Sequence, residues 1–244
     1  EALFVSSTGT ADDNNDYAFN HSNDALQNPE TGVQIMRVQE ANYSFDMNRT
    51  DVNQFGNLAA IDRVILEQPT VSLDFSYYVQ SGENERQLGF NTDGQTSAIK
   101  NFLNATADVK NYYIYVEGEG DDASNGTTGT AKCIGLGNGT LTNYTLDAAV
   151  GDMPTASLTA ECFNMTFYDA CTGTKPSIKV TDGSIQGGHF RLPQPESGDG
   201  YSCLRHGDIH ATVSGTKGLV TGDLKLQNFS FGLGLDREPI QRLG

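Results

Sequence analysis

Tryptophan is absent from this chain of 244 residues, and positively charged residues are scarce. The 15 Lys and Arg stand against 31 Asp and Glu, so the formal net charge is −16 at pH 7. Proteins that grip nucleic acid or anionic membranes need a surplus of Lys and Arg, so the composition disfavours both classes. The lack of Trp also disfavours a carbohydrate-processing enzyme, because sugar-stacking platforms favour the indole ring.

Long hydrophobic runs and known catalytic motifs are missing as well. The longest apolar cluster, at 112–116, is far shorter than the roughly 20 residues that a membrane-spanning helix needs. The chain contains no G-x-S-x-G or H-E-x-x-H pattern, and the glycine cluster at 135–139 lacks the lysine of a P-loop. The sequence therefore predicts neither a membrane-spanning helix nor an enzyme, and no cofactor is expected.

Two kinds of residue cluster suggest metal sites without matching one. Cys203, His206 and His210 have ligand types that zinc accepts, but Gly207 precedes a strand-like segment, so no helical face brings the imidazoles together. The acidic stretches at 12–16 and 117–122 offer oxygen ligands for Ca²⁺ but do not follow the EF-hand pattern. We expect ordinary histidines and solvated loops here, and no metal.

Alternation of apolar and polar side chains with a period of two is the dominant pattern, and it predicts strands at 42–47, 70–79 and 155–163. The alternation at 224–235 changes frame at Gln227 and Asn228, which predicts a β-bulge or a strand crossing between two sheets. Further strands are expected at 33–38, 111–117, 131–135 and 209–214, short helices at 57–66 and 97–103, and glycine-rich loops at 118–126 and 135–139.

These patterns predict a mainly β protein, a barrel or sandwich with one or two short helices and long loops. We expect a single domain over residues 1–244, with an inserted surface lobe at about 162–203. The four cysteines can form two disulfides or remain buried thiols, and the sequence leaves both options open: Cys133, Cys162, Cys171 and Cys203.

Three segments resemble the tail tube protein, or major tail protein, of tailed bacteriophages. The first spans 42–78. The second, at 141–166, contains a V-G-D-x-P-T-A-S turn between two strands, and the third, at 224–244, ends in R-E-x-x-x-R-L-G. Together they cover about a third of the chain, in the order that the family has. The chain stops at Gly244, where similar proteins often continue with another strand.

The resemblance implies a β-barrel or sandwich protomer that forms hexameric rings, stacked into a hollow tube that conducts DNA. Its implied partners are further copies of the chain, other tail proteins and passing genomic DNA that is not tightly bound, with no membrane. The implied location is the virion, after assembly in the host bacterial cytoplasm. The acidic composition agrees with this function, because a conduit must not hold duplex DNA, which carries about one negative charge per 1.7 Å.

On this hypothesis the two faces of the alternating strands have different roles. The apolar residues form the core: Tyr43, Phe45, Met47, Val71, Leu73, Phe75 and Leu158. The polar residues line the lumen of the tube: Ser44, Asp46, Ser72, Asp74, Ser76, Ser157 and Glu161. The alternative is that this polar set faces bulk solvent outside any assembly.

Several of the few arginines lie in the matching segments, where we expect each to pair with a carboxylate, since the guanidinium fork suits bidentate pairing. Nearby carboxylates are Asp51, Asp62, Asp236 and Glu238. The expected contacts between subunits or rings comprise Arg49, Asp51, Asn53, Phe55, Arg63, Arg237 and Arg242. The alternative for 49–55 is a loop with contacts only inside its own chain.

A secreted or cell-surface β-sandwich adhesin is the alternative from another class. It would use the nine N-x-[ST] sequons as glycan sites, the cysteines as disulfides and the acidic loops for Ca²⁺. Another virion component, such as a tail terminator or decoration protein, is a third reading.

Overall fold

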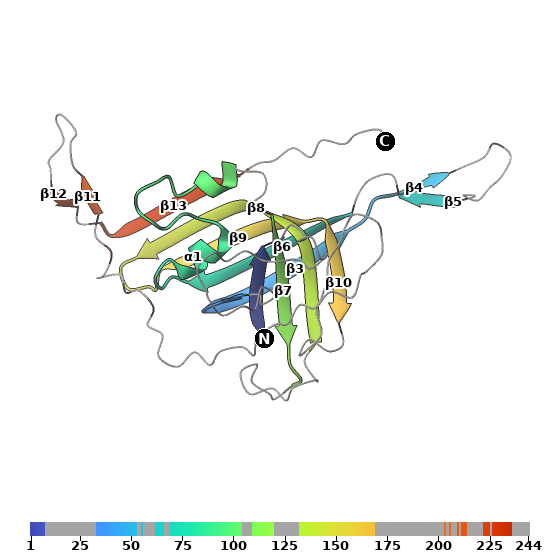
Figure 1. The fold of residues 1–244 in the computed structure, drawn as a ribbon, viewed down its shortest axis with the longest axis horizontal. Coiled ribbons are helices and arrows are strands. Elements are labelled where there is room, and N and C mark those ends of the chain that lie inside the picture. The colour runs from blue at the N-terminus through green and yellow to red at the C-terminus, as the bar shows by residue number, and fades with distance from the viewer. Residues whose placement is uncertain are drawn as a thin grey trace, which may run out of the picture.

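The computed structural model describes residues 1–7, 33–52, 55, 62–65, 69–103, 109–119, 132–168, 203, 205, 209, 211–213, 222–224 and 226–235. Within these residues the protein is mainly β, as the sequence predicts, with one short α-helix and one turn of 3₁₀-helix (Figure 1). In chain order the elements are β1 (Ala2–Ser7), β2 (Val33–Ile35), β3 (Val38–Asp46), β4 (Arg49–Val52), β5 (Asp62–Ile65), β6 (Thr70–Tyr78), α1 (Glu83–Leu88), η1 (Lys100–Leu103), β7 (Lys110–Val116), β8 (Lys132–Ala149), β9 (Thr155–Cys162), β10 (Asn164–Tyr168), β11 (Ala211–Val213), β12 (Gly222–Leu224) and β13 (Asn228–Gly234).

One antiparallel sheet of nine strands organises the molecule. Its order is β2-β1-β7-β8-β9-β6-β3, and both β10 and β13 also pair with β8. Two small hairpins, β4–β5 and β11–β12, form separate two-stranded sheets. Among the described pairings, four strands have a partner on one side only, namely β2, β3, β10 and β13, and of these β3 and β13 bound the group β3-β6-β9-β8-β13.

Strand β8 spans 18 residues and connects two differently oriented parts of the sheet. Its first half pairs with β7 and β10, and its second half with β9 and β13, so the strand turns between the two groups in Figure 1. The glycines at 135–139, expected in a loop, lie inside this strand. At Gly139 a side chain would lie 2.7 Å from both Cys162 Sγ and Tyr112 Cε2, so glycine allows the closest approach at the bend.

The hydrophobic core lies against one face of the large sheet. Val71, Leu73 and Phe75 on β6 and Leu158 on β9 are buried there, as predicted. The sequence also predicted core positions for Tyr43 and Phe45 on β3 and for Met47, just after its end. That expectation is wrong for Tyr43 and Phe45, which are 40% and 44% exposed, and Met47 is half-buried. They share the apolar face, but β3 ends the sheet order and pairs only with β6 among the described strands, so no neighbouring strand packs on their other side.

Helix α1 packs on the apolar face and is held there by two adjacent residues of its first turn, Asn84 and Glu85. The buried Asn84 side chain accepts from Met36 N at 2.9 Å and donates to Met36 O at 2.8 Å. Glu85 Oε1 accepts from the hydroxyls of Tyr77 (2.9 Å) and Tyr144 (3.1 Å) on β6 and β8. Burial, reinforced by the Glu85 charge, raises the pKa of both phenols, so they stay protonated donors.

The other expected elements are partly confirmed. The helix at 97–103 is present as η1, whereas the helix expected at 57–66 is wrong in its described part, because 62–65 forms β5. Helix α1 was not predicted. The frame change at Gln227 and Asn228 separates β12 and β13, which belong to different sheets, so the crossing reading is the correct one. The lobe expected at about 162–203 lies mostly outside the described residues, and β10 at its start belongs to the large sheet.

Candidate functional site

The candidate site is the polar face of five adjacent strands, β3-β6-β9-β8-β13, opposite the core. Cross-strand pairing places the outward side chains in rows of hydroxyl, amide and carboxylate groups. One row joins Ser44, Ser72 and Glu161, the next joins Asn42, Asp74 and Thr159, and a third joins Ser76, Ser157 and Thr145. All the residues expected at the lumen lie on this one face: Ser44, Asp46, Ser72, Asp74, Ser76, Ser157 and Glu161.

Positive charge is absent from the described residues of this face. Five carboxylates lie on it: Glu40, Asp46, Asp74, Asp147 and Glu161. The Lys and Arg residues that the structure describes lie in turns, on hairpins, on helices or in the other part of the sheet: Arg37, Arg49, Arg63, Arg86, Lys100, Lys110, Lys132 and Arg205. Ordinary protein surfaces intersperse both signs of charge, so a face with acidic groups alone is a distinctive feature.

Hydrogen bonding orders part of this face. Thr159 Oγ1 donates to Asp74 Oδ1 at 2.7 Å across the β6–β9 pair. Thr142, at the bulge in β8, donates instead to the backbone oxygen of Thr159 at 3.1 Å. The face therefore presents acceptor groups and hydroxyls at positions that the rigid sheet fixes.

Exposed aromatic side chains lie on the two strands that bound this five-strand group, β3 and β13. Tyr43 and Phe45 on β3 and Phe229 and Phe231 on β13 are 40–44% exposed, although their register neighbours on the same apolar face are buried or, for Leu146 opposite Phe231, half-buried. Each edge thus combines unpaired backbone groups with an uncovered apolar strip, which in a monomer favours association with another strand.

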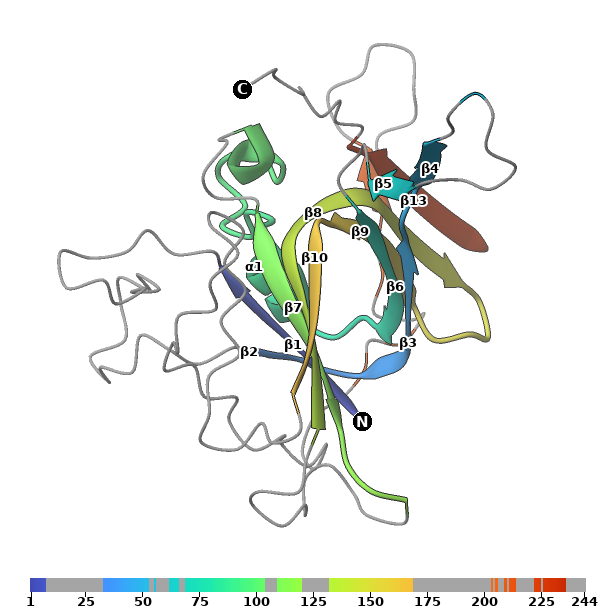
Figure 2. The same cartoon turned by 90° about the vertical axis from the view of Figure 1, so that its right-hand side faces the viewer.

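The β4–β5 hairpin projects from the end of β3, as Figures 1 and 2 show. Every described residue of it is exposed, including Phe55 and Ile65. Arg63 pairs with Asp51 across the hairpin at 2.7 Å, a pair between partners that the sequence suggested. Arg49 Nε donates to Met47 Sδ at 3.4 Å and forms no ion pair with any residue in the described ranges.

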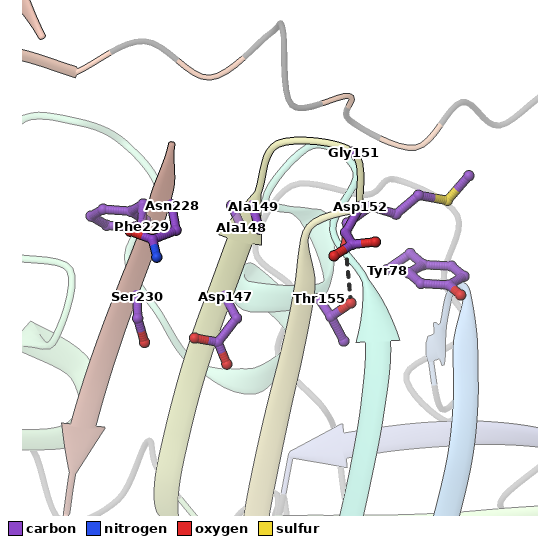
Figure 3. A pocket seen from close by; sticks show the side chains of 11 residues that line it. Tyr78, Asp147, Ala148, Ala149, Gly151, Asp152, Thr155, Asn228, Phe229 and Ser230 are labelled. Atoms are coloured by element: carbon purple, nitrogen blue, oxygen red, sulfur yellow. Dashed lines mark hydrogen bonds between the residues drawn. The ribbon is translucent and has the colours of Figure 1, made fainter. Parts of the chain in front are cut away.

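A shallow hollow of about 740 Å³ lies at the opposite end of the same sheet (Figure 3). Its floor and walls come from the ends of β6, β8, β9 and β13 and from the turn between β8 and β9. The carboxylates of Asp147 and Asp152, the Tyr78 ring and the exposed side chains of Met153 and Phe229 border it. Neither carboxylate forms an ion pair within the part of the chain that the structure describes.

Some predicted site residues lie outside the described residues, namely Asn53, Arg237 and Arg242, together with Asp236 and Glu238. The same holds for His206 and His210 of the zinc candidate and for Asp12, Asp13, Asp16, Asp121 and Asp122 of the acidic loops. Across the described ranges no group of three metal-ligating side chains comes together. No helix there is both long and apolar enough to cross a membrane.

The cysteines bear on the adhesin reading. Cys133 and Cys162 are buried free thiols and Cys203 is a half-buried one, while Cys171 lies outside the described residues. Burial, with a smaller effect of the Glu161 charge, raises the pKa of the Cys162 thiol to about 12. A framework of two disulfides needs all four cysteines, so these free thiols do not fit that part of the alternative.

Sequence reasoning missed the contribution of β8 and β13 to the face. Asn143, Thr145 and Asp147 alternate with apolar residues in the same way as β6, but the register shift between Leu141 and Asn143 breaks the period. The signal was present within 143–148 alone. Ser230 joins the row of Asp147 only through the pairing of β13 with β8, which no local pattern shows.

The fold and this face together define a mainly β sheet protein with a polar acidic face and two open edges. No protein-family model matches the chain, and no curated protein matches it. Among solved structures it is similar to a chain in the tail of an empty GTA particle of C6 symmetry, with 13% identity, a TM-score of 0.36, and coverage of 56% of this chain and 86% of that one.

The chain is also similar to the cap that terminates the tube of the anti-feeding prophage. The identity is 14%, the TM-score is 0.37, and the match covers 69% of this chain and 88% of that one. Both are tail or tube structures, the class that the sequence resembles.

Proposed function

We propose that the protein is a structural, non-catalytic component of a phage-type tail, whose copies assemble into rings that stack as a tube. On this proposal the polar face of β3-β6-β9-β8-β13 lines the bore, and DNA passes along it without tight binding. One combination of features carries the proposal. The face has five carboxylates and no cation among its described residues, and the strands on both sides of it have free edges with exposed apolar side chains.

The charge of the face suits transport of a polyanion. Proteins that hold duplex DNA use Lys and Arg, whose phosphate contacts release counterions and make affinity high. Asp74, Glu161 and Asp147 offer phosphate no such contact, while hydroxyls and amides keep the surface wet. A bore of this composition would let DNA enter, pass and leave. Charged linings of ion channels meet the same requirement, because they bind an ion weakly enough for it to leave.

The two edges supply the means of assembly. Edge β3 of one copy pairing with edge β13 of the next is a heterologous contact, which closes into a ring when the rotation per copy divides a full turn. Pairing would satisfy backbone groups of both strands and cover exposed aromatic side chains on each edge, Tyr43 and Phe45 on β3 and Phe231 on β13. On this proposal, the aromatic side chains that are exposed in a single protomer become buried where two protomers meet.

The size of such a ring is compatible with DNA passage. Each copy contributes five strands to the face, so six copies would supply thirty. At about 4.8 Å between strands the circumference is at least about 140 Å and the backbone diameter about 46 Å, and strand tilt increases both. After side chains are subtracted, the bore exceeds the width of a DNA duplex. The exposed hairpin residues Arg49, Asp51, Phe55 and Arg63 are then proposed contacts between copies or rings, as are Asn53, Arg237 and Arg242.

Electron microscopy of the purified full chain tests the proposal. We expect hollow filaments at high protein concentration, and a reconstruction in which Asp74 and Glu161 face the bore. Phe45→Glu and Phe231→Glu should each abolish the filaments while the monomer keeps its far-ultraviolet circular dichroism, because both side chains are already 44% exposed.

Phe167→Glu provides the matched control. Phe167 is 63% exposed but lies on β10, away from the two proposed edges, so this variant should assemble normally. Concentrated wild-type protein that stays monomeric would refute the tube. Filaments whose map places lysines and arginines around the bore would refute the role of the face.

A further inference from the structure

The hairpin and the hollow lie at opposite ends of one sheet. The β4–β5 hairpin follows Asp46, which pairs with Thr70 at the start of β6, whereas the hollow includes Tyr78 at the other end of β6. Eight residue steps of a strand span about 27 Å, so the hairpin of one copy cannot reach its own hollow. Two features separated along the strand direction can meet only between copies that follow one another along that direction.

We propose that the β4–β5 hairpin of one copy docks in the hollow bordered by Asp147, Asp152 and Phe229 of a second copy in the next ring. This inference rests on the proposed function and adds the receptor site for the hairpin. The contact is head-to-tail, and its repetition produces an open-ended stack of the kind that heterologous contacts generate.

Charge complementarity supports the second copy as the occupant. The hollow carries two carboxylates without an ion pair among the described residues, and the hairpin carries Arg49, which forms no ion pair there either. Arg63 pairs with Asp51 on the hairpin itself, and the Asp62 carboxylate accepts from the backbone N–H of Arg63 at 2.7 Å, so the four described charges of the hairpin balance and Arg49 is its cation without a carboxylate partner among the described residues. The two terminal nitrogens of the Arg49 guanidinium can donate to a carboxylate of the hollow while Nε keeps its contact with Met47 Sδ.

Apolar surface supports the same occupant. Phe55 is fully exposed, Val52 and Ile65 are 43% and 47% exposed, and the other residues of the hairpin that the structure describes are exposed as well. At the other end Met153 and Phe229 are 56% and 40% exposed at the border of the hollow. An aromatic anchor in an apolar-edged hollow, surrounded by charged pairs, is the usual composition of a specific contact.

Charge reversal tests this docking separately from ring formation. In Asp147→Lys/Asp152→Lys, rings should form as in wild type, but the critical concentration for tube growth should rise about tenfold or more, because like charges then meet. Adding Arg49→Glu should restore growth, since the charges are exchanged. Glu119→Lys, an exposed substitution near the end of β7, is the control and should leave tube growth unchanged.

A cross-linking experiment covers the case in which the lysine variant fails to fold. Phe55→Cys protein mixed with Met153→Cys protein should give, on oxidation, a disulfide-linked dimer of unlike copies that neither variant gives alone. Absence of that dimer in mixed tubes, or normal tube growth by the folded lysine variant, overturns the docking while leaving the tube intact. Wild-type protein that forms no tube at all overturns the proposed function and the docking together.

Discussion

Replacement of Gly139 by alanine is the sharpest test of how the bend in β8 is packed. A Cβ at this position would lie 2.7 Å from Cys162 Sγ, 2.7 Å from Tyr112 Cε2 and 3.0 Å from Tyr112 Cδ2. Cys162 and Tyr112 are both completely buried, so neither can move aside into solvent. The backbone of Gly139 does not adopt a positive φ, so the expected penalty is steric.

The magnitude follows from the overlap. Favourable contacts between nonbonded heavy atoms occur at about 3.5–4.0 Å, so the new methyl group is roughly 1 Å too close to two side chains. Overpacking of this kind costs about 1–3 kcal/mol. Alanine recovers about 0.5–1 kcal/mol relative to glycine in a strand, which leaves a net loss of about 1–2 kcal/mol. For a chain of this size the melting temperature should fall by about 2–8 °C.

Denaturant and thermal unfolding of the unassembled protein measure the effect, with far-ultraviolet circular dichroism as the signal because the chain has no Trp. Gly232→Ala on β13 is the matched control, since nothing lies within 4 Å of a Cβ there, and it should be neutral or slightly stabilising. Cys162→Ala should relieve part of the penalty in the double variant with Gly139→Ala. Equal stability of the two glycine variants would refute the packing argument.

Two further predictions concern the buried hydroxyl and thiol groups. Glu85→Ala should lower the free energy of unfolding by about 2 kcal/mol or more, because the hydroxyls of Tyr77 and Tyr144 lose their acceptor. Glu85→Gln should lower it by less, and equal losses for the two variants in denaturant titrations would contradict this. Stability should also fall above about pH 9, because burial raises the pKa values of Cys162, Tyr77 and Tyr112. Above that pH the unfolded chain releases protons that the folded chain retains. The free energy of unfolding then decreases by up to about 1.4 kcal/mol per pH unit for each group. A denaturation midpoint that stays constant from about pH 8 to about pH 11 would contradict that sign.

The local pattern of apolar and polar residues was enough to predict the strands and the part of the polar face that β3, β6 and β9 form. The period of two in β6 and β9 placed Val71, Leu73, Phe75 and Leu158 in the core and left the hydroxyls and carboxylates between them on one face. The prediction succeeds because successive residues of a strand point to opposite faces of the sheet, and only one face of these two strands packs on the core.

Pairing decided what the pattern of each strand could not. Tyr43 and Phe45 have the alternation of a core strand, yet they are exposed because β3 ends the sheet order, and that order depends on contacts far apart in the chain. The glycines of β8 indicated a loop from composition, although they lie in a bent strand in which Gly139 packs closely against Cys162. Sequence thus determined which side chains share a strand face and the excess of negative charge. Only the tertiary structure decided which strands are edges, that five polar faces join into one, and that a hairpin and a hollow occupy opposite ends, since each depends on long-range pairing that no local period encodes.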